Sequence, residues 1–402
     1  MRIGEIRELI QLKPAELNAT RRRLAACHDI DDLRAAGRRL IPRPVFDYVD
    51  GAADEELAVR ANRAAFRRWR LRPRLLTDVS AVDTTATVLD RTQPLPLALG
   101  PTGYTRMMHQ AGEIAVARSA HRHGLAYTLS TMATTSIEDV SDAVTDTAAL
   151  WFQLYVHRDE GLNKELVSRA RTAGYGALMV TIDTVVSGRR IRDVRNGLVI
   201  PPALTANTLA SIALRPGYWT RMLRGPALEF ANLPNRHDPL TVAGSALKFD
   251  PSITWATIEA LRAQWPGPLL LKGPLGPADA VRAIEAGVDG IILSNHGGRQ
   301  LDRAIPPADL LPGVREAVGP DARIFVDSGI RHGADIAVAI ALGADAALIG
   351  RAYLYGLMAG GEQGVDRALD LLSEQFTRTL QLLGVQSLAE LRAAGHELLD
   401  RS

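Results

Sequence analysis

Short runs of apolar and small residues recur along the chain, and each is followed by a stretch with apolar residues at helical spacing. Eight runs have the length and composition of buried strands: "PLPLALGPTG" (94–103), "LAYTLST" (125–131), "LWFQLY" (150–155), "ALMVTID" (177–183), "PLLLKG" (268–273), "GIILSN" (290–295), "RIFVDSG" (323–329) and "AALIGR" (346–351). The stretches between them, such as "PADAVRAIEAG", often end on glycine, which is typical of a helix C-cap. Strict alternation of strands and helices predicts a parallel sheet, and eight such units predict an α/β fold of the closed TIM-barrel type, a (β/α)8 barrel.

The same pattern divides the chain into three parts. We expect an N-terminal helical section over residues 1–92 that packs on the barrel, the barrel over 93–386 and a C-terminal tail over 387–402. The connection between the fourth and fifth strands, residues 184–255, is far longer than the others, and a long insertion on the catalytic face of a barrel usually forms a lid or a partner surface. Its stretch "RPGYWTRMLRG" mixes aromatic and apolar residues with arginines. We favour a lid, and the alternative is an amphipathic helix on a membrane surface.

Polar side chains appear near the carboxyl end of each predicted strand. These ends meet at one mouth of a barrel, which is where barrel enzymes carry their chemistry. The residues expected there are Thr102, Ser130, Gln153, Tyr155, Thr181, Asp183, Lys272, Ser294, His296, Asp327 and Arg351. Polar loops after strands would explain part of this set, but not a lysine, a histidine and an aspartate that emerge from strand interiors.

Charge and cysteine content narrow the classes of protein. The net charge of +2 gives no global field that would attract nucleic acid, so we expect no nucleic-acid partner. Cys27 is the only cysteine, which excludes a disulfide framework and favours a reducing compartment. We find no secretory signal, no membrane-spanning segment and no histidine spacing suited to a metal. A cytoplasmic protein is expected, with attachment to the inner face of the membrane as the only form of membrane contact.

Two of the predicted loops suggest a phosphate site. Barrels often bind phosphate through the loops after strands seven and eight, with backbone amides and a helix N-terminus. Those loops contain Gly329 with Arg331, and Gly350 with Arg351. The glycines let the backbone approach an anion and the arginines add charge-assisted donors, so the pattern predicts a phosphorylated ligand.

Lys272 indicates which phosphorylated ligand this is. A buried ammonium group needs a negative partner, and a flavin ring, which gains negative charge on reduction, would supply one. Ser130, Gln153 and Thr181 could bind the polar edge of such a ring. Nothing resembles the glycine-rich fingerprint of a nicotinamide-binding fold, so FMN is favoured over NAD.

The stretch "SNHGGRQLD" resembles the signature of the FMN-dependent 2-hydroxy acid oxidases and dehydrogenases, a family that includes glycolate oxidase, lactate dehydrogenases and mandelate dehydrogenase. Further similarity runs in order through "PRPVFDYVDGAADEE", "GPTG", "WFQLYVHRD", "TIDTVVSGRRIRDVRNG", "LLLKG", "DSGIRHGADI" and "GRAYLYGLMAGGEQGV", nearly the whole chain. The resemblance implies the barrel, FMN as cofactor and a small 2-hydroxy acid as substrate. It also implies a homotetramer.

The resemblance assigns roles to individual residues. His296 would be the catalytic base and Asp183 would orient its imidazole; histidine suits this role because its unperturbed pKa of about 6.5 lies near working pH. Arg299, Arg190 and Tyr48 would hold the substrate carboxylate, and Tyr155 would bind its hydroxyl. Lys272 would stabilise reduced flavin. The other residues implied for the FMN site are Pro101, Thr102, Gly103, Ser130, Gln153, Thr181, Ser294, Asp327, Gly329, Arg331, Gly350 and Arg351.

Two departures bear on the substrate and the electron acceptor. Gly103 stands where oxidases of the family commonly have alanine, and Met132 replaces the tryptophan of glycolate oxidase. We therefore expect an L-lactate dehydrogenase that passes electrons to a quinone-type acceptor. The alternatives are an (S)-mandelate-type dehydrogenase, an oxygen-using oxidase or monooxygenase, an enzyme acting on a hydroxy acid or amine in a natural-product or peptide-derived cofactor pathway, and, from another class, a non-catalytic flavin-binding barrel.

Overall fold

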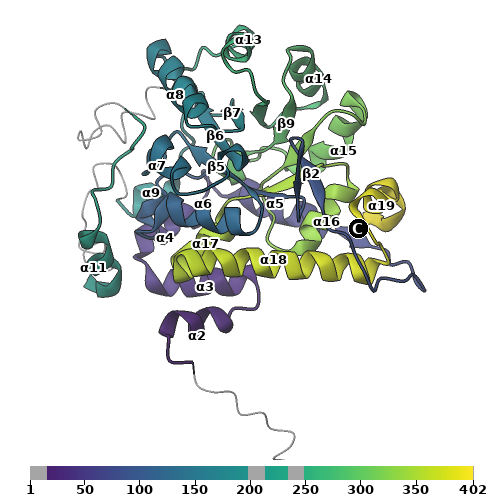
Figure 1. Cartoon of the computed structure of the whole chain (residues 1–402), viewed down its shortest axis with the longest axis horizontal. Helices are drawn as coiled ribbons and strands as arrows, with labels where there is room; N and C mark the ends of the chain where they lie inside the picture. Colours follow the sequence, from purple (N-terminus) through teal and green to yellow (C-terminus); the bar gives the residue numbers. More distant parts are fainter. Residues whose placement is uncertain (1–15, 198–212, 234–248, 402) are drawn as a thin grey trace, which may run out of the picture.

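The computed structural model describes residues 16–197, 213–233 and 249–401; residues 1–15, two parts of the predicted insertion (198–212 and 234–248) and Ser402 lie outside the described residues. The eight predicted strands form a closed parallel barrel in the order β10-β11-β4-β5-β6-β7-β8-β9. They are Leu97–Leu99 (β4), Ala126–Ser130 (β5), Leu150–Tyr155 (β6), Ala177–Thr181 (β7), Leu269–Gly273 (β8), Gly290–Leu293 (β9), Ile324–Val326 (β10) and Ala346–Ile349 (β11). Each lies inside its predicted segment, so the barrel prediction is confirmed (Figure 1).

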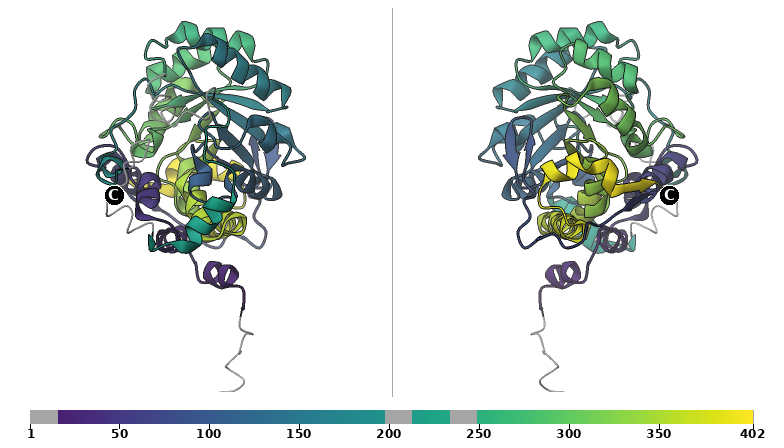
Figure 2. Two further views of the ribbon diagram at one scale, coloured as in Figure 1. Left: turned by 90° about the vertical axis from the view of Figure 1, so that its left-hand side faces the viewer. Right: turned by 90° about the vertical axis from the view of Figure 1, so that its right-hand side faces the viewer.

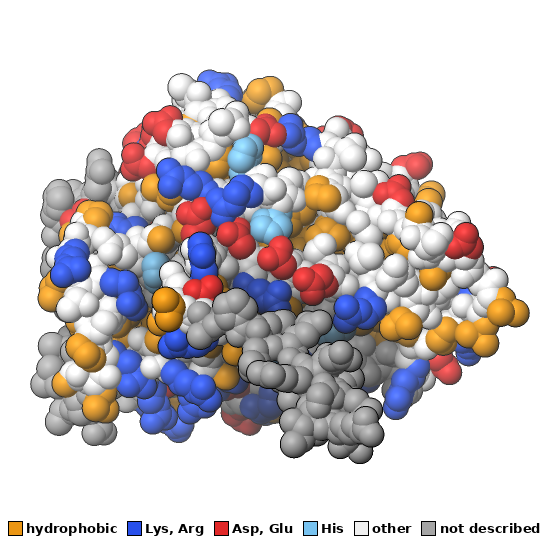
Figure 3. Space-filling view, turned by 60° about the horizontal axis from the view of Figure 1, so that its bottom comes forward, with side chains coloured by type: hydrophobic (Ala, Val, Ile, Leu, Met, Phe, Trp, Pro, Cys, Tyr) orange, Lys and Arg blue, Asp and Glu red, His pale blue; other side chains and the backbone are white. Residues whose placement is uncertain are grey.

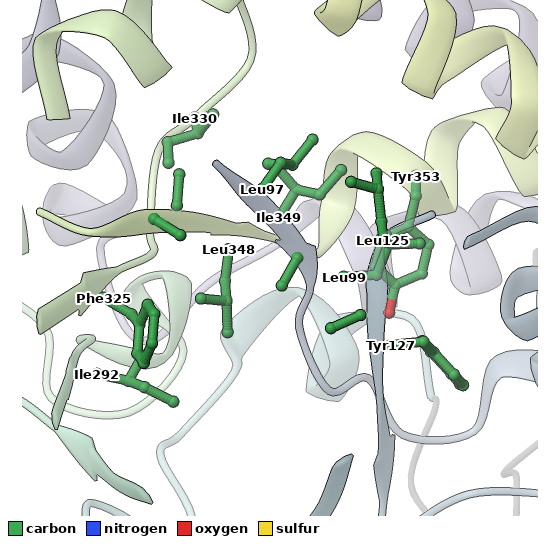
Figure 4. Packing of buried hydrophobic residues seen from close by; sticks show 14 of the residues in the cluster. Leu97, Leu99, Leu125, Tyr127, Ile292, Phe325, Ile330, Leu348, Ile349 and Tyr353 are labelled. Carbon is green, nitrogen blue, oxygen red and sulfur yellow. The ribbon is translucent and has the colours of Figure 1, made fainter. Parts of the chain in front are cut away.

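Continuous burial explains why these segments are strands. Nearly every residue of the eight is buried, as expected when helices cover the outside of a parallel sheet and side chains fill its inside. Closure occurs between the first and last strands, where Leu97 and Leu99 of β4 pair with Ala347 and Ile349 of β11. Figure 4 shows Leu97, Leu99 and Ile349 packed together, with Tyr353 and Tyr127 beside them.

Helices follow the strands, as the alternating pattern predicted. They are Gly112–Arg122 (α6), Ile137–Ser141 (α7), Glu160–Thr172 (α8), Trp255–Gln264 (α13), Pro277–Glu285 (α14), Pro307–Val318 (α15), Gly333–Ala341 (α16), Arg351–Gly360 (α17) and Glu362–Leu383 (α18). Several begin at a side-chain cap, such as Ser136 before α7 and Asp159 before α8. Short 3-10 turns occur at Thr105–Met107 (η1), Thr147–Ala149 (η2) and His296–Gly298 (η3).

The N-terminal section consists of helices and short strands. Its helices are Ala19–Ala25 (α2), Ile30–Leu40 (α3), Arg43–Asp50 (α4) and Leu57–Arg67 (α5), and they are followed by strands Trp69–Leu71 (β1), Ala86–Val88 (β2) and Arg91–Gln93 (β3). Figures 1 and 2 show α2, α3 and α18 on one side of the barrel and α8, α13 and α14 on the opposite side. The sequence predicted only helices here, and the three-residue strands are an addition.

The C-terminal residues return to the N-terminal section. Helices Leu388–Ala393 (α19) and Gly395–Leu398 (α20) lead to strand Leu399–Arg401 (β12). This strand pairs antiparallel with β1 in a separate two-stranded sheet. The predicted tail is therefore folded against the N-terminal section.

The described parts of the insertion contain helices Ile191–Arg195 (α9) and Pro216–Arg224 (α11). Tyr218 of α11 is buried and its hydroxyl donates to the carbonyl of Met107 at 2.7 Å, so one aromatic residue of this helix packs inward as a lid would. Leu223 on the same helix is 82% exposed. Within the described residues, no helix has both the length and the apolar character needed to cross a bilayer.

Candidate active site

The carboxyl ends of the barrel strands open into one cavity of about 260 Å³. Predicted site residues from many parts of the chain line it together: Tyr48, Pro101, Thr102, Gly103, Tyr155, Thr181, Arg190, Lys272, His296, Arg299, Asp327, Gly329, Arg331, Gly350 and Arg351. Four further predicted residues, Ser130, Gln153, Asp183 and Ser294, do not line the cavity. Each of these four is buried or partly buried, and three of them bond to a residue that does line it.

The turn η3 brings His296 to the cavity in an unusual backbone conformation. His296, Gly297 and Gly298 all have positive φ, at 58°, 65° and 76°. Glycine accepts this region freely, whereas a residue with a side chain occupies it at a cost of about 1–2 kcal/mol, so the surrounding contacts must hold His296 there. The Ser294 hydroxyl accepts from the backbone N–H of His296 at 3.0 Å, and Ser328 accepts from that of Gly297 at 3.0 Å.

The imidazole of His296 lies between an aspartate and a tyrosine. Its Nδ1 is 3.2 Å from Oδ1 of Asp183, and its Nε2 is 3.3 Å from the hydroxyl of Tyr155. Burial alone would raise the pKa of Asp183, but the charge and hydrogen bond of His296 and the charge of Lys272 hold that pKa below its ordinary value. Asp183 is therefore an anion that fixes a proton on Nδ1 and leaves Nε2 as the basic atom.

Two guanidinium groups and a tyrosine ring form the next part of the cavity. The Cζ atoms of Arg299 and Arg190 lie 5.0 Å and 5.9 Å from the ring centre of Tyr48. Arg190 donates to Asp193 at 2.8 Å, whereas the acceptors of Arg299 among the described residues are the backbone carbonyls of Tyr48 (2.5 Å) and Gly51 (3.2 Å). Burial, and then the charge of Arg190, lower the pKa of Arg299. A carboxylate placed here would give the buried guanidinium of Arg299 a negative partner and would offset its repulsion by Arg190.

Charge pairing distinguishes Arg299 from Arg190, Lys272 and His296 as a partner for an added anion. In residues 16–197, 213–233 and 249–401, Arg190, Lys272 and His296 each have a carboxylate within 4.0 Å, and Arg299 has none. A buried cation without a carboxylate partner is costly unless a ligand supplies one. Among the described residues, Arg299 thus adds an unpaired positive charge to the part of the cavity that holds His296, while Arg331 and Arg351, which also line the cavity, donate to backbone carbonyls.

Lys272 has a protein partner. Its ammonium group donates to the Ser294 hydroxyl at 2.7 Å and lies 3.3 Å from Oδ2 of Asp327. The sequence suggested a flavin as the negative partner of this cation, and it did not reveal that the ends of β8 and β10 bring Lys272 and Asp327 together. Lys272 alone does not require a flavin.

The glycines and arginines of the two predicted phosphate loops line the same cavity, and we refer to the part that they form as the phosphate end. Its phosphate-binding role stays a prediction. Gly329 has φ 121°, and a Cβ there would lie 2.6 Å from the carbonyl oxygen of Asn62, so only glycine fits. Gly350 precedes α17, whose N-terminus faces the same cavity. Arg331 and Arg351 both line it.

Arg351 also binds protein groups. It donates at 2.8 Å to the carbonyls of Val49, Gly297 and Gly51, and these bonds use three of the five N–H donors of a guanidinium, which leaves two for a ligand. Burial, together with the charges of Arg299 and Arg331, lowers the pKa of Arg351 to about 10. An anion at this end would therefore be strongly favoured, and Arg351 would join it to the N-terminal section.

The polar groups of the cavity fit FMN. Gln153 does not line the cavity itself, but its side-chain oxygen accepts from Ser130 at 2.8 Å, and Ser130 in turn accepts from the backbone N–H of the cavity residue Met132 at 3.2 Å. The amide nitrogen of Gln153 is buried and has no hydrogen-bond partner among the described residues. A buried donor without a partner is rare and suits a carbonyl of the flavin ring. Pro101, Thr102 and Gly103 would lie along the ring. These individual roles stay predictions.

Several cavity residues were not foreseen from the sequence. Phe230 and Phe249 come from the insertion, and the ring of Phe249 lies 4.8 Å from that of Tyr155. No periodic pattern marks an isolated aromatic residue in such a segment. Gln300 could have been found from its place beside Arg299: its side chain donates to the carbonyls of Asp183 and Val186 at 2.8 Å and joins the histidine loop to the insertion.

Comparison with known proteins gives the family. The protein-family model described as FMN-dependent dehydrogenase matches residues 37–397. The chain belongs to the FMN-dependent dehydrogenase family. A Mycobacterium tuberculosis protein named provisionally as an L-lactate dehydrogenase is 47% identical over 392 residues, which cover 97% of this chain and 94% of that protein. An L-lactate dehydrogenase of Acinetobacter baumannii is 38% identical over 370 residues, with 90% of this chain and 96% of that protein covered.

Solved structures of related dehydrogenases share the fold. The crystal structure of the monotopic membrane protein (S)-mandelate dehydrogenase has a TM-score of 0.89 and 38% identity, and the match covers 94% of this chain and all of that one. This FMN-dependent dehydrogenase is thus an oxidoreductase of the 2-hydroxy acid type, related in sequence to lactate dehydrogenases and in structure to mandelate dehydrogenases.

Proposed function

We propose that this FMN-dependent dehydrogenase oxidises L-lactate to pyruvate and passes the electrons to a quinone-type acceptor. The observation that carries the proposal is the position of His296, which is paired with Asp183, in one cavity with Arg299, a cation without a carboxylate partner among the described residues. Relatives at 38–47% identity are named as L-lactate dehydrogenases. A 2-hydroxy carboxylate supplies both an anion for Arg299 and a proton for His296.

The protein groups divide the work of oxidation. Arg299 and Arg190 bind the carboxylate of the substrate, with the hydroxyl of Tyr48 as a third donor. Nε2 of His296 accepts a proton from the substrate, while Asp183 holds the ring and stabilises the imidazolium that forms. Tyr155 binds the substrate hydroxyl. FMN supplies the two-electron acceptor when it is bound, and the residues act in the same way whether the electrons leave as a hydride or after carbanion formation.

The wall of the cavity admits a second candidate substrate. Met132, Phe230 and Phe249 give this wall an apolar surface, which suits a methyl group and also suits an aromatic ring. The structural relative named (S)-mandelate dehydrogenase favours the larger substrate. Met132 packs closely against Gly103, where an added Cβ would lie only 3.0 Å from the Met132 Cβ, and the residue at this position bears on whether oxygen can react.

An anaerobic panel tests the proposal. The purified yellow protein is mixed without oxygen with L-lactate, D-lactate, glycolate or (S)-mandelate, and the loss of flavin absorbance is followed. We expect L-lactate to reduce the flavin fastest and air to reoxidise it slowly, with a quinone analogue restoring rapid turnover. Faster reduction by (S)-mandelate would favour the second candidate, and rapid peroxide formation in air would make the protein an oxidase.

His296→Gln distinguishes an enzyme from a flavin-binding protein without catalysis. An enzyme should keep its bound FMN and lose flavin reduction by orders of magnitude. If L-lactate reduces the flavin of the variant as fast as that of the parent protein, the assignment of His296 as the base is refuted.

Helix α11 supports a peripheral membrane contact for access to a quinone. Leu223 of α11 is 82% exposed and Arg221 and Arg224 lie on the same helix, while Leu214, just before the helix, is 70% exposed. Figure 3 shows basic and apolar side chains close together on the side of the molecule where Figure 1 places α11. Basic and apolar residues on one exposed helix suit an anionic lipid surface, and one structural relative is described as a monotopic membrane protein.

Sedimentation with vesicles tests this contact. We expect the protein to sediment with vesicles containing phosphatidylglycerol but not with phosphatidylcholine alone, and the double variant Leu223→Ser with Arg224→Ser to bind more weakly with unchanged flavin reduction. The proposal would be contradicted if the parent protein and the double variant sedimented equally with both kinds of vesicle. Analytical ultracentrifugation of the same protein tests the homotetramer implied by the family.

A further inference from the structure

Two buried asparagine side chains join the N-terminal section to the histidine loop. Asn62 lies on α5 and Asn295 immediately precedes His296, and the two are 1% and 2% exposed. The amide nitrogen of Asn62 donates to the oxygen of Asn295 at 2.7 Å, and the amide nitrogen of Asn295 donates to the oxygen of Asn62 at 2.7 Å. The pair is thus a reciprocal amide dimer between segments 233 residues apart.

Asn295 uses the same side chain to shape the turn η3. Its oxygen also accepts from the backbone N–H of Gly298 at 3.1 Å. This bond spans His296, the residue that occupies the positive-φ region at φ 58°. Because the left-handed conformation is unfavourable for histidine, the orientation of the imidazole depends on contacts that hold the turn closed.

Helix α5 is a rigid support for this turn. A Cβ at Gly298 would lie 2.6 Å from the backbone nitrogen of Val59, so helix and turn touch backbone to backbone. On the other side of the turn, the carboxylate of Asp302 accepts from the N–H groups of Glu55 (3.0 Å) and Ala58 (2.8 Å) and holds the start of α5. The asparagine pair and Asp302 therefore fasten the histidine loop to one helix at two points.

We propose that Asn62 is a positioning residue for His296, acting through Asn295, although it touches neither the substrate nor the flavin. This inference rests on the proposed role of His296 as the base. An asparagine is required because its amide offers one donor and one acceptor to the matching amide of Asn295, and a carboxylate would offer acceptors only and add a buried charge. The alternative is a pair that only anchors α5 to the barrel.

Flavin reduction by L-lactate in a single anaerobic turnover tests the role of Asn62. We expect Asn62→Ala to retain FMN and to lower the limiting rate constant by about 10- to 100-fold, as a misplaced base would. The L-lactate concentration for half-maximal rate should change less than about threefold, because Arg299 is held separately by Tyr48 and Gly51. A pair that only anchors the helix would lower the melting temperature and leave the rate constant unchanged, which would overturn the proposal.

Hydrogen exchange provides a readout that does not depend on turnover. The amide protons of a peptide spanning residues 294–303 should exchange at least about tenfold faster in Asn62→Ala than in the parent protein, with or without FMN. The control is Gln93→Ala, which removes a buried amide that accepts from the N–H of Ala126 at the opposite end of the barrel. It should leave both the exchange of this peptide and flavin reduction unchanged.

A double-mutant cycle decides whether the two asparagines act together. If the two residues act as one unit, the double variant Asn62→Ala with Asn295→Ala should reduce its flavin no more slowly than the slower single variant. If their roles are independent, the two losses in rate constant should multiply. If Asn62→Ala does not fold, Asn62→Ser, which keeps a polar group, replaces it in these experiments, and we expect the same results. Parent-like reduction by His296→Gln would refute the proposed function itself, whereas an inactive His296→Gln beside a fully active Asn62→Ala would refute only the positioning role.

Discussion

Replacing Asp183 with asparagine tests how much the negative charge of Asp183 contributes to the function of His296. The substitution keeps the shape of the side chain and removes one negative charge 3.2 Å from Nδ1 of His296. Coulomb's law gives about 1 kcal/mol for this separation in water and about 5 kcal/mol at an effective dielectric constant near 20. Because the Asp183 side chain is only 7% exposed, the loss should lie toward the larger value, which corresponds to a fall in the flavin-reduction rate of several hundredfold to several thousandfold.

The assay is anaerobic reduction of the bound flavin by L-lactate. FMN content should be preserved in Asp183→Asn, because Asp183 does not line the cavity. The matched control is Asp370→Asn: Asp370 also lies 3.2 Å from a histidine nitrogen, in this case Nε2 of His123, but its side chain is 52% exposed and outside the cavity. We expect no change in the control. A loss of less than about tenfold in Asp183→Asn would refute the charge argument.

Three further predictions concern the clamp, the N-terminal section and the phosphate end. Arg299→Met should lower kcat/KM for L-lactate by about 100-fold or more, whereas Arg303→Met, which changes an arginine side chain that is 72% exposed, should have little effect; equal values would contradict the clamp. Burial alone would raise the pKa of Asp50, but its arginine and tyrosine partners lower it from 3.8 to about 2. Its contribution to stability is therefore complete above about pH 4 and lost as the pH falls toward 2, so Asp50→Asn should lower the free energy of unfolding by about 2 kcal/mol at neutral pH and by almost nothing near pH 2 in urea titrations. Gly329→Ala should weaken FMN retention at least about tenfold in dialysis, because its Cβ would meet the Asn62 carbonyl at 2.6 Å in a conformation that alanine rarely adopts; full retention would show that the loop can move.

Local sequence pattern was sufficient to predict the barrel. A segment such as "PLLLKG" is apolar along its whole length because both faces of β8 are covered, and this signal needs no knowledge of distant residues. The predicted strands extended too far at their carboxyl ends. The segment "RIFVDSG" contributes only Ile324–Val326 to β10, and the polar residues that follow this strand belong to the cavity. Strand pairing stops where these side chains turn toward the mouth.

Partners across the fold could not be predicted in the same way. The sequence placed Lys272 and Asp327 at strand ends but could not show that they lie 3.3 Å apart. The pairing of Asn62 with Asn295 joins two segments with no shared pattern, and the strand β1 has only three residues. Each of these contacts depends on how helices and loops pack after the barrel has formed, and pairwise geometry of that kind leaves no periodic signal.

The pairing of β1 with β12 has a consequence for synthesis on the ribosome. Residues 69–71 emerge early, but their partner strand, residues 399–401, is translated only after all eight barrel strands. Folding of domains during translation generally begins from the N-terminus, so β1 must wait with an open edge until almost the whole chain has emerged. Completion of this small sheet is therefore a late step of biogenesis. A fusion partner placed directly after Arg401 would interfere with the pairing of β12 with β1.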